Sequence, residues 1–126
     1  MACQRQEVDS TVAPLPNIQT VSASKQLAFI NDRIEDDSYV PEYYYQRAKL
    51  HSAANNLRLA MKDIQAAISL DSSRSHYHFW KAQVLDVLNA PRDAINAALK
   101  AEQLGYAGVE LDVLLGKLHY LNQNPV

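Results

Sequence analysis

Apolar and small residues recur along the chain at a fixed interval of 34 positions. The segment YYYQRAKLH, which begins at Tyr43, has the same pattern as YHFWKAQVL, which begins at Tyr77. The matched positions further along are Ala48 and Ala82, Asn55 and Asn89, Ala60 and Ala94, Ala67 and Ala101, and Leu70 and Leu104. Self-similarity at a period of 20–50 residues is typical of chains that stack one structural unit several times. We therefore predict a stacked-repeat architecture.

Spacings of three and four between apolar residues predict two helices in each full repeat, residues 41–74 and 75–108. Pro41 and Pro91 suit the first turn of a helix, and Asn55-Asn56 predicts a turn followed by an N-cap. The residues expected on buried faces are Tyr44, Ala48, Leu57, Ala60, Ile64, Ala67 and Ile68, then Phe79, Trp80, Ala82, Leu85, Ala94, Ile95, Ala98 and Ala101. The charged residues between them, such as Lys62 and Asp63, are expected on solvated faces.

Residues at the boundaries of the repeats indicate where helices begin and end. Ser73 and Ser75 offer N-caps for the second repeat, and Gly105 suits the left-handed position that closes a helix. Residues 109–126 predict the first helix of a truncated third repeat, with an apolar face of Leu111, Leu114, Leu115, Leu118 and Leu121. Terminal repeats normally have a polar outer face, and these leucines have no evident cover. Either the array continues beyond this chain, which we favour, or the last helix pairs with another molecule or another copy.

The N-terminal part divides in two. Residues 1–23 are polar, lack a period and contain Pro14 and Pro16, so we expect a disordered tether. From Ser24, a plausible N-cap, the spacing of Leu27, Ile30 and Ile34 predicts a helix. Residues 24–38 match the second half of a repeat, and we interpret them as a degenerate half repeat.

The repeat resembles the tetratricopeptide repeat. The residues that carry the resemblance are Tyr44, Ala48, Ala60, Ile64, Ala67 and Leu70-Asp71, then Ala82, Ala94, Ala98, Ala101 and Leu104, and finally Leu115-Gly116. The match covers residues 24–126 and implies an all-α fold of antiparallel helix pairs stacked in a right-handed superhelix. Ser72 and Gly105-Tyr106 depart from the pattern, because they stand where the family usually has a proline.

Composition narrows the classes of function. A net charge of -2 gives no electrostatic footprint for nucleic acid, and the apolar runs are too short to span a bilayer. The lone cysteine, Cys3, excludes an internal disulfide and a cysteine zinc site. Its place ahead of a polar tether resembles the start of a mature bacterial lipoprotein, so it is either a lipidation site or an incidental cysteine. The sequence therefore allows two locations for the protein: the cytoplasm, or the periplasm with a lipid anchor at Cys3.

No constellation for catalysis or cofactor binding is visible. The sequence has no Gly-rich phosphate loop and no HExxH pair. His76-Tyr77-His78 is the densest histidine feature, but alternate positions on a helix point to different sides, so one metal ion cannot be held by both rings there. We therefore expect neither an enzyme nor a cofactor.

The resemblance implies instead that the first helices of successive repeats line a concave groove that holds peptides. The residues it places there are Tyr45, Lys49, His76, Phe79, Trp80, Gln83, Val113, Lys117 and Tyr120. Tyr45, Phe79 and Val113 would form an apolar stripe, or else the two rings lie in the core. The carboxylate clamp of chaperone-binding members is not expected, because Tyr45 and Phe79 replace its first charged residue.

These observations favour a non-catalytic protein-interaction scaffold that binds a partner segment in the groove. The alternative is a structural repeat segment that self-associates, or braces a larger envelope or secretion assembly, through its last helix. The apolar leucines of residues 109–126 motivate that alternative.

Overall fold

A computed structural model describes residues 22–123 of the chain. Over this range the protein forms helices and no strand, which confirms the all-α prediction. The helices are α2 (Ala23–Asp36), α3 (Pro41–Ala53), α4 (Leu57–Leu70), α5 (Ser75–Val87), α6 (Pro91–Gln103) and α7 (Val109–Gln123). The tether expected over residues 1–23 lies outside the described residues, apart from Ser22 and Ala23.

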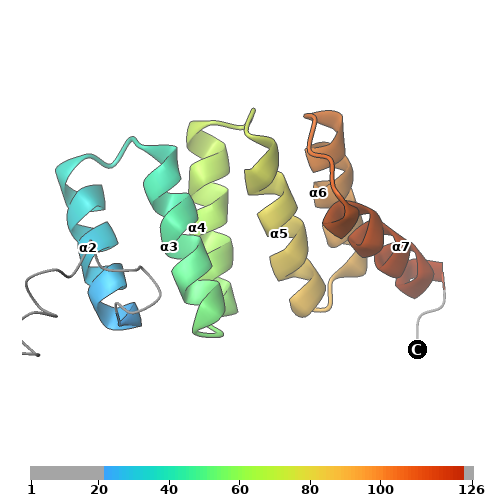
Figure 1. Cartoon of the computed structure of the whole chain (residues 1–126), viewed down its shortest axis with the longest axis horizontal. Coiled ribbons are helices and arrows are strands. Elements are labelled where there is room, and N and C mark those ends of the chain that lie inside the picture. Colours follow the sequence, from blue (N-terminus) through green and yellow to red (C-terminus); the bar gives the residue numbers. More distant parts are fainter. Residues whose placement is uncertain (1–21, 124–126) are drawn as a thin grey trace, which may run out of the picture.

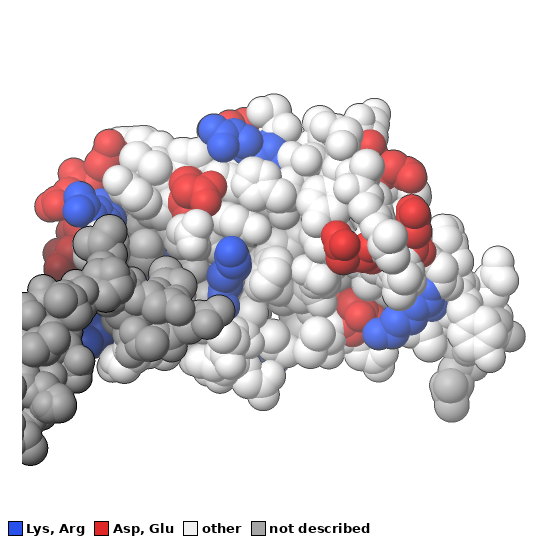
Figure 2. Space-filling model, in the orientation of Figure 1, with Lys and Arg blue, Asp and Glu red and all other residues white. Residues whose placement is uncertain are grey.

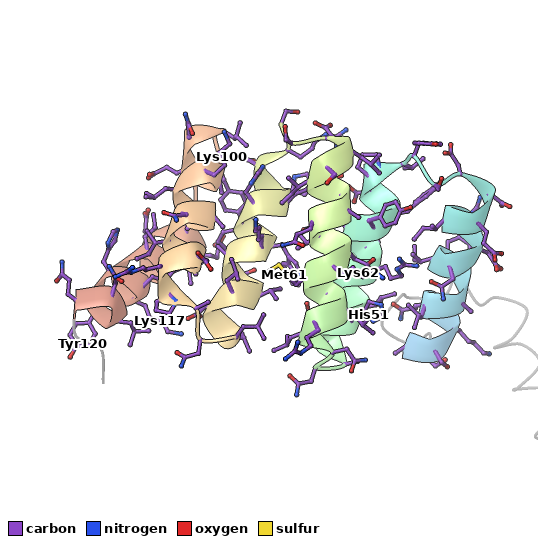
Figure 3. All side chains as sticks on the ribbon, turned by 180° about the vertical axis from the view of Figure 1, so that it is seen from behind. His51, Met61, Lys62, Lys100, Lys117 and Tyr120 are labelled. Carbon is purple, nitrogen blue, oxygen red and sulfur yellow. The ribbon has the colours of Figure 1, made fainter. Side chains whose placement is uncertain are left out.

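The helices stand in a row in chain order, and each packs mainly against its neighbours (Figure 1). The α3–α4 and α5–α6 hairpins have the most extensive contacts, and α5 also touches α7. Helices α3, α5 and α7 lie on the near side in Figure 1, and we call the surface that they form the front face. The opposite surface, formed by α4 and α6 and seen in Figure 3, is the rear face.

Alanines at the repeated positions set the distance between the helices. Ala48, Ala60 and Ala67 and their counterparts Ala82, Ala94 and Ala101 are all 0% exposed. A side chain of one carbon lets two helix backbones approach closely, whereas a larger one would force them apart. Larger residues such as Ile64 and Tyr77, also 0% exposed, fill the space beside these contacts. The register predicted for the two full repeats is therefore confirmed.

Three helices end in the same way. Asn55 and Asn89 have φ values of 62°, and Gly105 has a φ of 102°. After α3, the amide of Asn55 donates to Ser52 O at 3.0 Å and the amide of Asn56 to His51 O at 2.8 Å. The same pair of bonds closes α5 and α6. Asparagine and glycine tolerate this left-handed conformation, so the turn predicted at Asn55 and the helix end predicted at Gly105 are confirmed, and Asn89, the counterpart of Asn55, has the same conformation.

Several predicted N-caps are wrong. Helix α2 is capped by Ser22, whose hydroxyl accepts from the amide of Lys25 at 3.3 Å, and not by Ser24. The cap position of α5 is Arg74, which makes no side-chain cap bond. In the turn between α4 and α5, the carboxylate of Asp71 accepts bonds from the amide and hydroxyl of Ser73 at 3.0 Å and 2.6 Å. These bonds lower the pKa of Asp71.

The leucines of α7 are covered, contrary to the prediction. Leu111, Leu114 and Leu118 are 1%, 8% and 0% exposed and belong to the core that α5 and α6 share with α7. Helix α7 lies across α6 (Figure 1), and Leu115, which is half-buried, packs against the same core. Its exposed apolar residues are instead Val109 and Val113, together with Tyr120. The terminal helix therefore presents a smaller apolar surface than the sequence suggested.

An ion pair joins α3 to α4. Nε of Arg47 donates to Oδ2 of Asp63 at 2.7 Å, and Nη2 donates to Oδ1 at 2.8 Å. Asp63, expected on a solvated face, is 4% exposed. Nη1 of Arg47 also donates to Asn31 of α2 at 3.0 Å, and Nε2 of His51 lies 3.5 Å from Asp63 Oδ2. Bidentate pairing with a guanidinium satisfies a carboxylate that would be costly to bury alone.

We expect Arg47→Ala to lower the free energy of unfolding by roughly 2–4 kcal/mol, because it leaves Asp63 buried beside His51 alone. Urea unfolding followed by circular dichroism measures this. The double variant Arg47→Ala with Asp63→Leu should recover most of the loss. Arg74→Ala is the matched control, since Arg74 pairs with Asp71 but its side chain is 50% exposed. An equal loss of unfolding free energy in Arg74→Ala would show that leaving Asp63 unpaired and buried does not destabilise the protein more than losing an exposed ion pair does.

Enlarging the alanine contacts tests the packing argument. Ala60→Leu and Ala94→Leu should each cost roughly 1–3 kcal/mol, because no space exists for the added carbons. Ala28→Leu on the exposed side of α2 is the control and should change stability by less than about 0.5 kcal/mol. Thermal unfolding of the three variants checks this. Neutral effects at both buried positions would contradict the close helix contact.

Candidate functional site

Aromatic rings of α3 and α5 meet on the front face. The ring centroid of Tyr45, on α3, lies 4.9 Å from His76, 5.0 Å from Tyr77 and 6.3 Å from Trp80, all on α5. The contacts with His76 and Trp80 are edge-to-face, an arrangement that aromatic quadrupoles favour. We call Tyr45, His76, Tyr77 and Trp80 the aromatic cluster. Three of its members were predicted as groove residues, and the helices bring them together.

Phe79 is buried and does not line the surface. Its ring is 6% exposed and stacks on Tyr106, with centroids 4.3 Å apart and an interplanar angle of 14°. Tyr106 follows Gly105 in the α6–α7 loop, where the positive φ of Gly105 reverses the chain. Val113, in contrast, is 65% exposed. The expected stripe of Tyr45, Phe79 and Val113 is therefore wrong at its middle member.

Lys49 extends over the aromatic cluster. Its Nζ lies 5.2 Å from the ring centroid of Tyr45 and 6.0 Å from that of Trp80. An ammonium within about 6 Å of a ring face is attracted by the negative face of the ring. Among residues 22–123, Lys49 forms no ion pair, since the cations that do are Arg47, His51, Arg74, His76 and Lys117. Lys49 therefore has its charge available beside apolar rings.

On the α7 side of the site, the predicted lysine is paired with a carboxylate. Nζ of Lys117 donates to Oδ2 of Asp86 at 2.9 Å, so this lysine bridges α7 to α5. The side chain of Lys117 is 56% exposed, whereas that of Asp86 is 16% exposed. Gln83 is half-buried, and Tyr120 is exposed near the end of α7. Of the two lysines expected in the groove, only Lys49 is without a carboxylate among the described residues.

Glu42 belongs to the site and was not predicted there. Its Oε1 accepts from the hydroxyl of Tyr77 at 3.1 Å, and its Oε2 accepts from Nε2 of Gln46 at 2.8 Å. Nε2 of His76 lies 3.8 Å from the same carboxylate. Burial and the charge of Glu42 raise the pKa of Tyr77 to about 12. Glu42 lies one helical turn before Tyr45, and this spacing was the signal available in the sequence.

Charge is sparse on this face. Figure 2 shows that most of the surface over α3 and α5 is uncharged, with isolated Lys, Arg, Asp and Glu side chains. The indole nitrogen of Trp80 and the hydroxyl of Ser52 are buried and have no hydrogen-bond partner among the described residues. The surface thus combines aromatic area with few fixed charges, a composition suited to contact with another protein.

The two histidines on either side of Tyr77 lie in different surroundings. His76 lies in the aromatic cluster, whereas His78 is 7% exposed and its Nε2 lies 2.9 Å from the carbonyl oxygen of Ser72. Residues 22–123 contain no group of three His, Cys, Asp or Glu side chains arranged to hold a metal ion. Cys3, the lipidation candidate, lies outside the described residues.

Within the described range, none of the helices is both long enough and apolar enough to cross a bilayer.

Comparisons with known proteins bear on the fold. No family model matches the sequence, and no curated protein matches it. The solved structures similar to the chain include YrrB, a tetratricopeptide repeat protein with an unusual peptide-binding site (25% identity, TM-score 0.72, 76% of this chain). They also include the first such domain of Spaghetti (RPAP3) bound to the HSP90 peptide SRMEEVD (16% identity, TM-score 0.77, 81% of each chain).

A third similar structure is the type III secretion chaperone SycD of Yersinia enterocolitica with a peptide of the translocator YopD (13% identity, TM-score 0.73, 79% of this chain and 82% of that one). The chain spans 50% of the length of YrrB. These similarities, together with the row of antiparallel helices, confirm an all-α fold of the tetratricopeptide repeat type.

The Tyr77–Glu42 contact predicts a pH dependence. The pKa of Tyr77 rises from 10.0 to about 12 on folding, so its contribution to stability is complete below pH 10 and is lost as the pH rises toward 12. Tyr77→Phe should therefore lose less stability than the wild type over this range. Urea midpoints measured at several pH values check this. Tyr39→Phe, at a ring that is 80% exposed, is the control and should follow the wild type.

Proposed function

We propose that the protein is a non-catalytic interaction scaffold whose front face binds an extended segment of a partner protein. The observation that carries the proposal is the position of Lys49, whose ammonium lies over the rings of Tyr45 and Trp80 and forms no ion pair among residues 22–123. Aromatic anchors beside a fixed charge are typical of the few residues that dominate binding energy at protein interfaces.

The geometry suggests what the segment must offer. An acceptor group, such as a carboxylate or a carbonyl oxygen, would reach Lys49, and an apolar side chain would pack beside Trp80. Val109 and Val113, which are 72% and 65% exposed, extend the apolar surface along α7. The Lys117–Asp86 bridge would lie between these two areas and hold α7 against α5.

Similar structures support this proposal. Spaghetti and SycD are bound to peptides, and YrrB is described as having a peptide-binding site. At the identities of Spaghetti and SycD, 16% and 13%, the likeness shows the fold alone. The support for peptide binding by this chain therefore comes from the residues of its own front face. The partner that we propose is a protein and not a nucleic acid.

The structural alternative, self-association through the last helix, has a smaller apolar surface to use than the sequence suggested. Leu111, Leu114 and Leu118 of α7 are in the core, and Leu115 and Leu121 are half-buried, so self-association through this helix would use mainly Val109, Val113 and Tyr120. Light scattering over a wide concentration range distinguishes the two functions. A mass that stays monomeric speaks against self-association and leaves the scaffold proposal intact.

Peptides selected from a random phage-displayed library against the purified protein test the scaffold proposal. Lys49→Glu should weaken the selected peptides by about tenfold or more, because it reverses the charge over the aromatic rings. Affinities are measured by fluorescence polarisation.

Leu99→Ser is the control, since Leu99 is 42% exposed on α6 and outside the front face. It should leave binding unchanged. Val113→Asp provides a second test at an exposed position, where misfolding is not expected. Selected peptides that bind both Lys49→Glu and Val113→Asp as tightly as the wild type would refute the proposal.

A further inference from the structure

The rear face carries a groove that the proposed function does not use. Helices α4 and α6 flank it, and α5 forms its floor around a cavity of 460 Å³, a size typical of ligand-binding cavities. Its lining residues are Met61, Gln65, His78, Lys81, Leu85, Asp93, Asn96, Ala97 and Lys100. Leu85 and Ala97 in the floor are 8% and 7% exposed, whereas Lys100 on the rim is exposed. The groove thus has an apolar floor and a polar rim.

A second cavity continues this groove along α4. It also has a volume of 460 Å³ and shares Met61 and Gln65 with the first. Arg58, Lys62 and Leu88 complete its lining. Figure 3 shows Met61 on the side of α4 that faces α5, with Lys100 on α6. The two cavities together form one elongated depression, which we call the rear groove.

The lining of the rear groove is positively charged. Arg58, Lys62, Lys81 and Lys100 contribute four cations, and Asp93 is the one acidic residue in the lining of these two cavities. None of the four cations forms an ion pair with any residue in the range 22–123, although Arg47, Arg74 and Lys117 elsewhere do. The chain as a whole has a net charge of -2. The positive lining is therefore a local feature and not a reflection of composition.

From this charge and the apolar floor we infer that the rear groove is a second interaction surface, which takes an acidic amphipathic segment of a protein partner. Leucine-like side chains of that segment pack on Met61, Leu85 and Ala97, and its carboxylates face Lys81 and Lys100. A polyanion such as nucleic acid fits less well, because it has no apolar side chains for the floor and meets Asp93 on the rim. The rear groove uses a different side of α5 from the aromatic cluster, so both surfaces can be occupied together.

A fluorescein-labelled amphipathic peptide of leucine and glutamate tests this inference by fluorescence polarisation. The wild type should bind it saturably, and more weakly as salt is added, because the lysines on the rim are screened. Lys81→Glu with Lys100→Glu should weaken binding by about tenfold or more, since two attractive contacts become repulsive. Because Lys81 is half-buried, Asn96→Glu on the exposed rim gives a second variant with the same expected direction.

Matched controls separate the groove from general charge effects. Lys25→Glu with Arg33→Glu changes the net charge equally on exposed positions of α2 and should alter affinity by less than about twofold. Lys49→Glu should also leave binding unchanged. A peptide with lysine in place of glutamate should not bind.

Four results would overturn the inference. The wild type could fail to bind the leucine–glutamate peptide, or the α2 variant could lose as much affinity as the groove variant. Lys49→Glu could abolish binding, which would place the peptide on the front face and would not count against the proposed function. A single-stranded oligothymidine could bind as tightly as the peptide and compete with it, which would make the groove a polyanion site.

Discussion

Close contact between helices at alanine positions is the constraint on which the remaining structure depends. Each full repeat places alanines where its two helices meet, and all of these side chains are fully buried. With the helices this close, large residues can be accommodated only beside the contacts, where Ile64, Tyr77 and Leu118 fill the core. The row of helices in Figure 1 follows from repeating this contact along the chain.

The same constraint creates the two surfaces of the protein. Alternate helices come to lie on opposite sides, so α3 and α5 share the front face while α4 and α6 frame the rear groove. Left-handed residues at Asn55 and Asn89 end the first helix of each full repeat, which keeps the turns short. Lys49 and Lys81 form no ion pair with residues 22–123, and we propose that they help to determine what each surface binds.

Periodicity made the helices and their buried alanines predictable, because every copy of the repeat must satisfy the same contact. Features that occur in one copy only could not be read from it. Tyr106 stacks on Phe79 and covers it. The corresponding residue of the preceding repeat is Ser72, so the alignment of the repeats could not predict that Phe79 is buried. Asp63 looked like a surface charge, and only the position of Arg47 on the neighbouring helix explains its burial. The spacing of the α7 leucines predicted one apolar face, but it does not encode that residues of α5 and α6 share a core with that face.

A peptide bound to the front face would lie against Trp80 and change the surroundings of its indole ring. Trp80 is the single tryptophan of the chain, so its indole N–H gives one resonance in a nitrogen–proton correlation spectrum. Its ring lies 6.3 Å from Tyr45 and under Lys49. Titration with a selected peptide should shift this resonance in step with the bound fraction. A peptide that saturates the protein while the indole resonance stays in place would contradict the account.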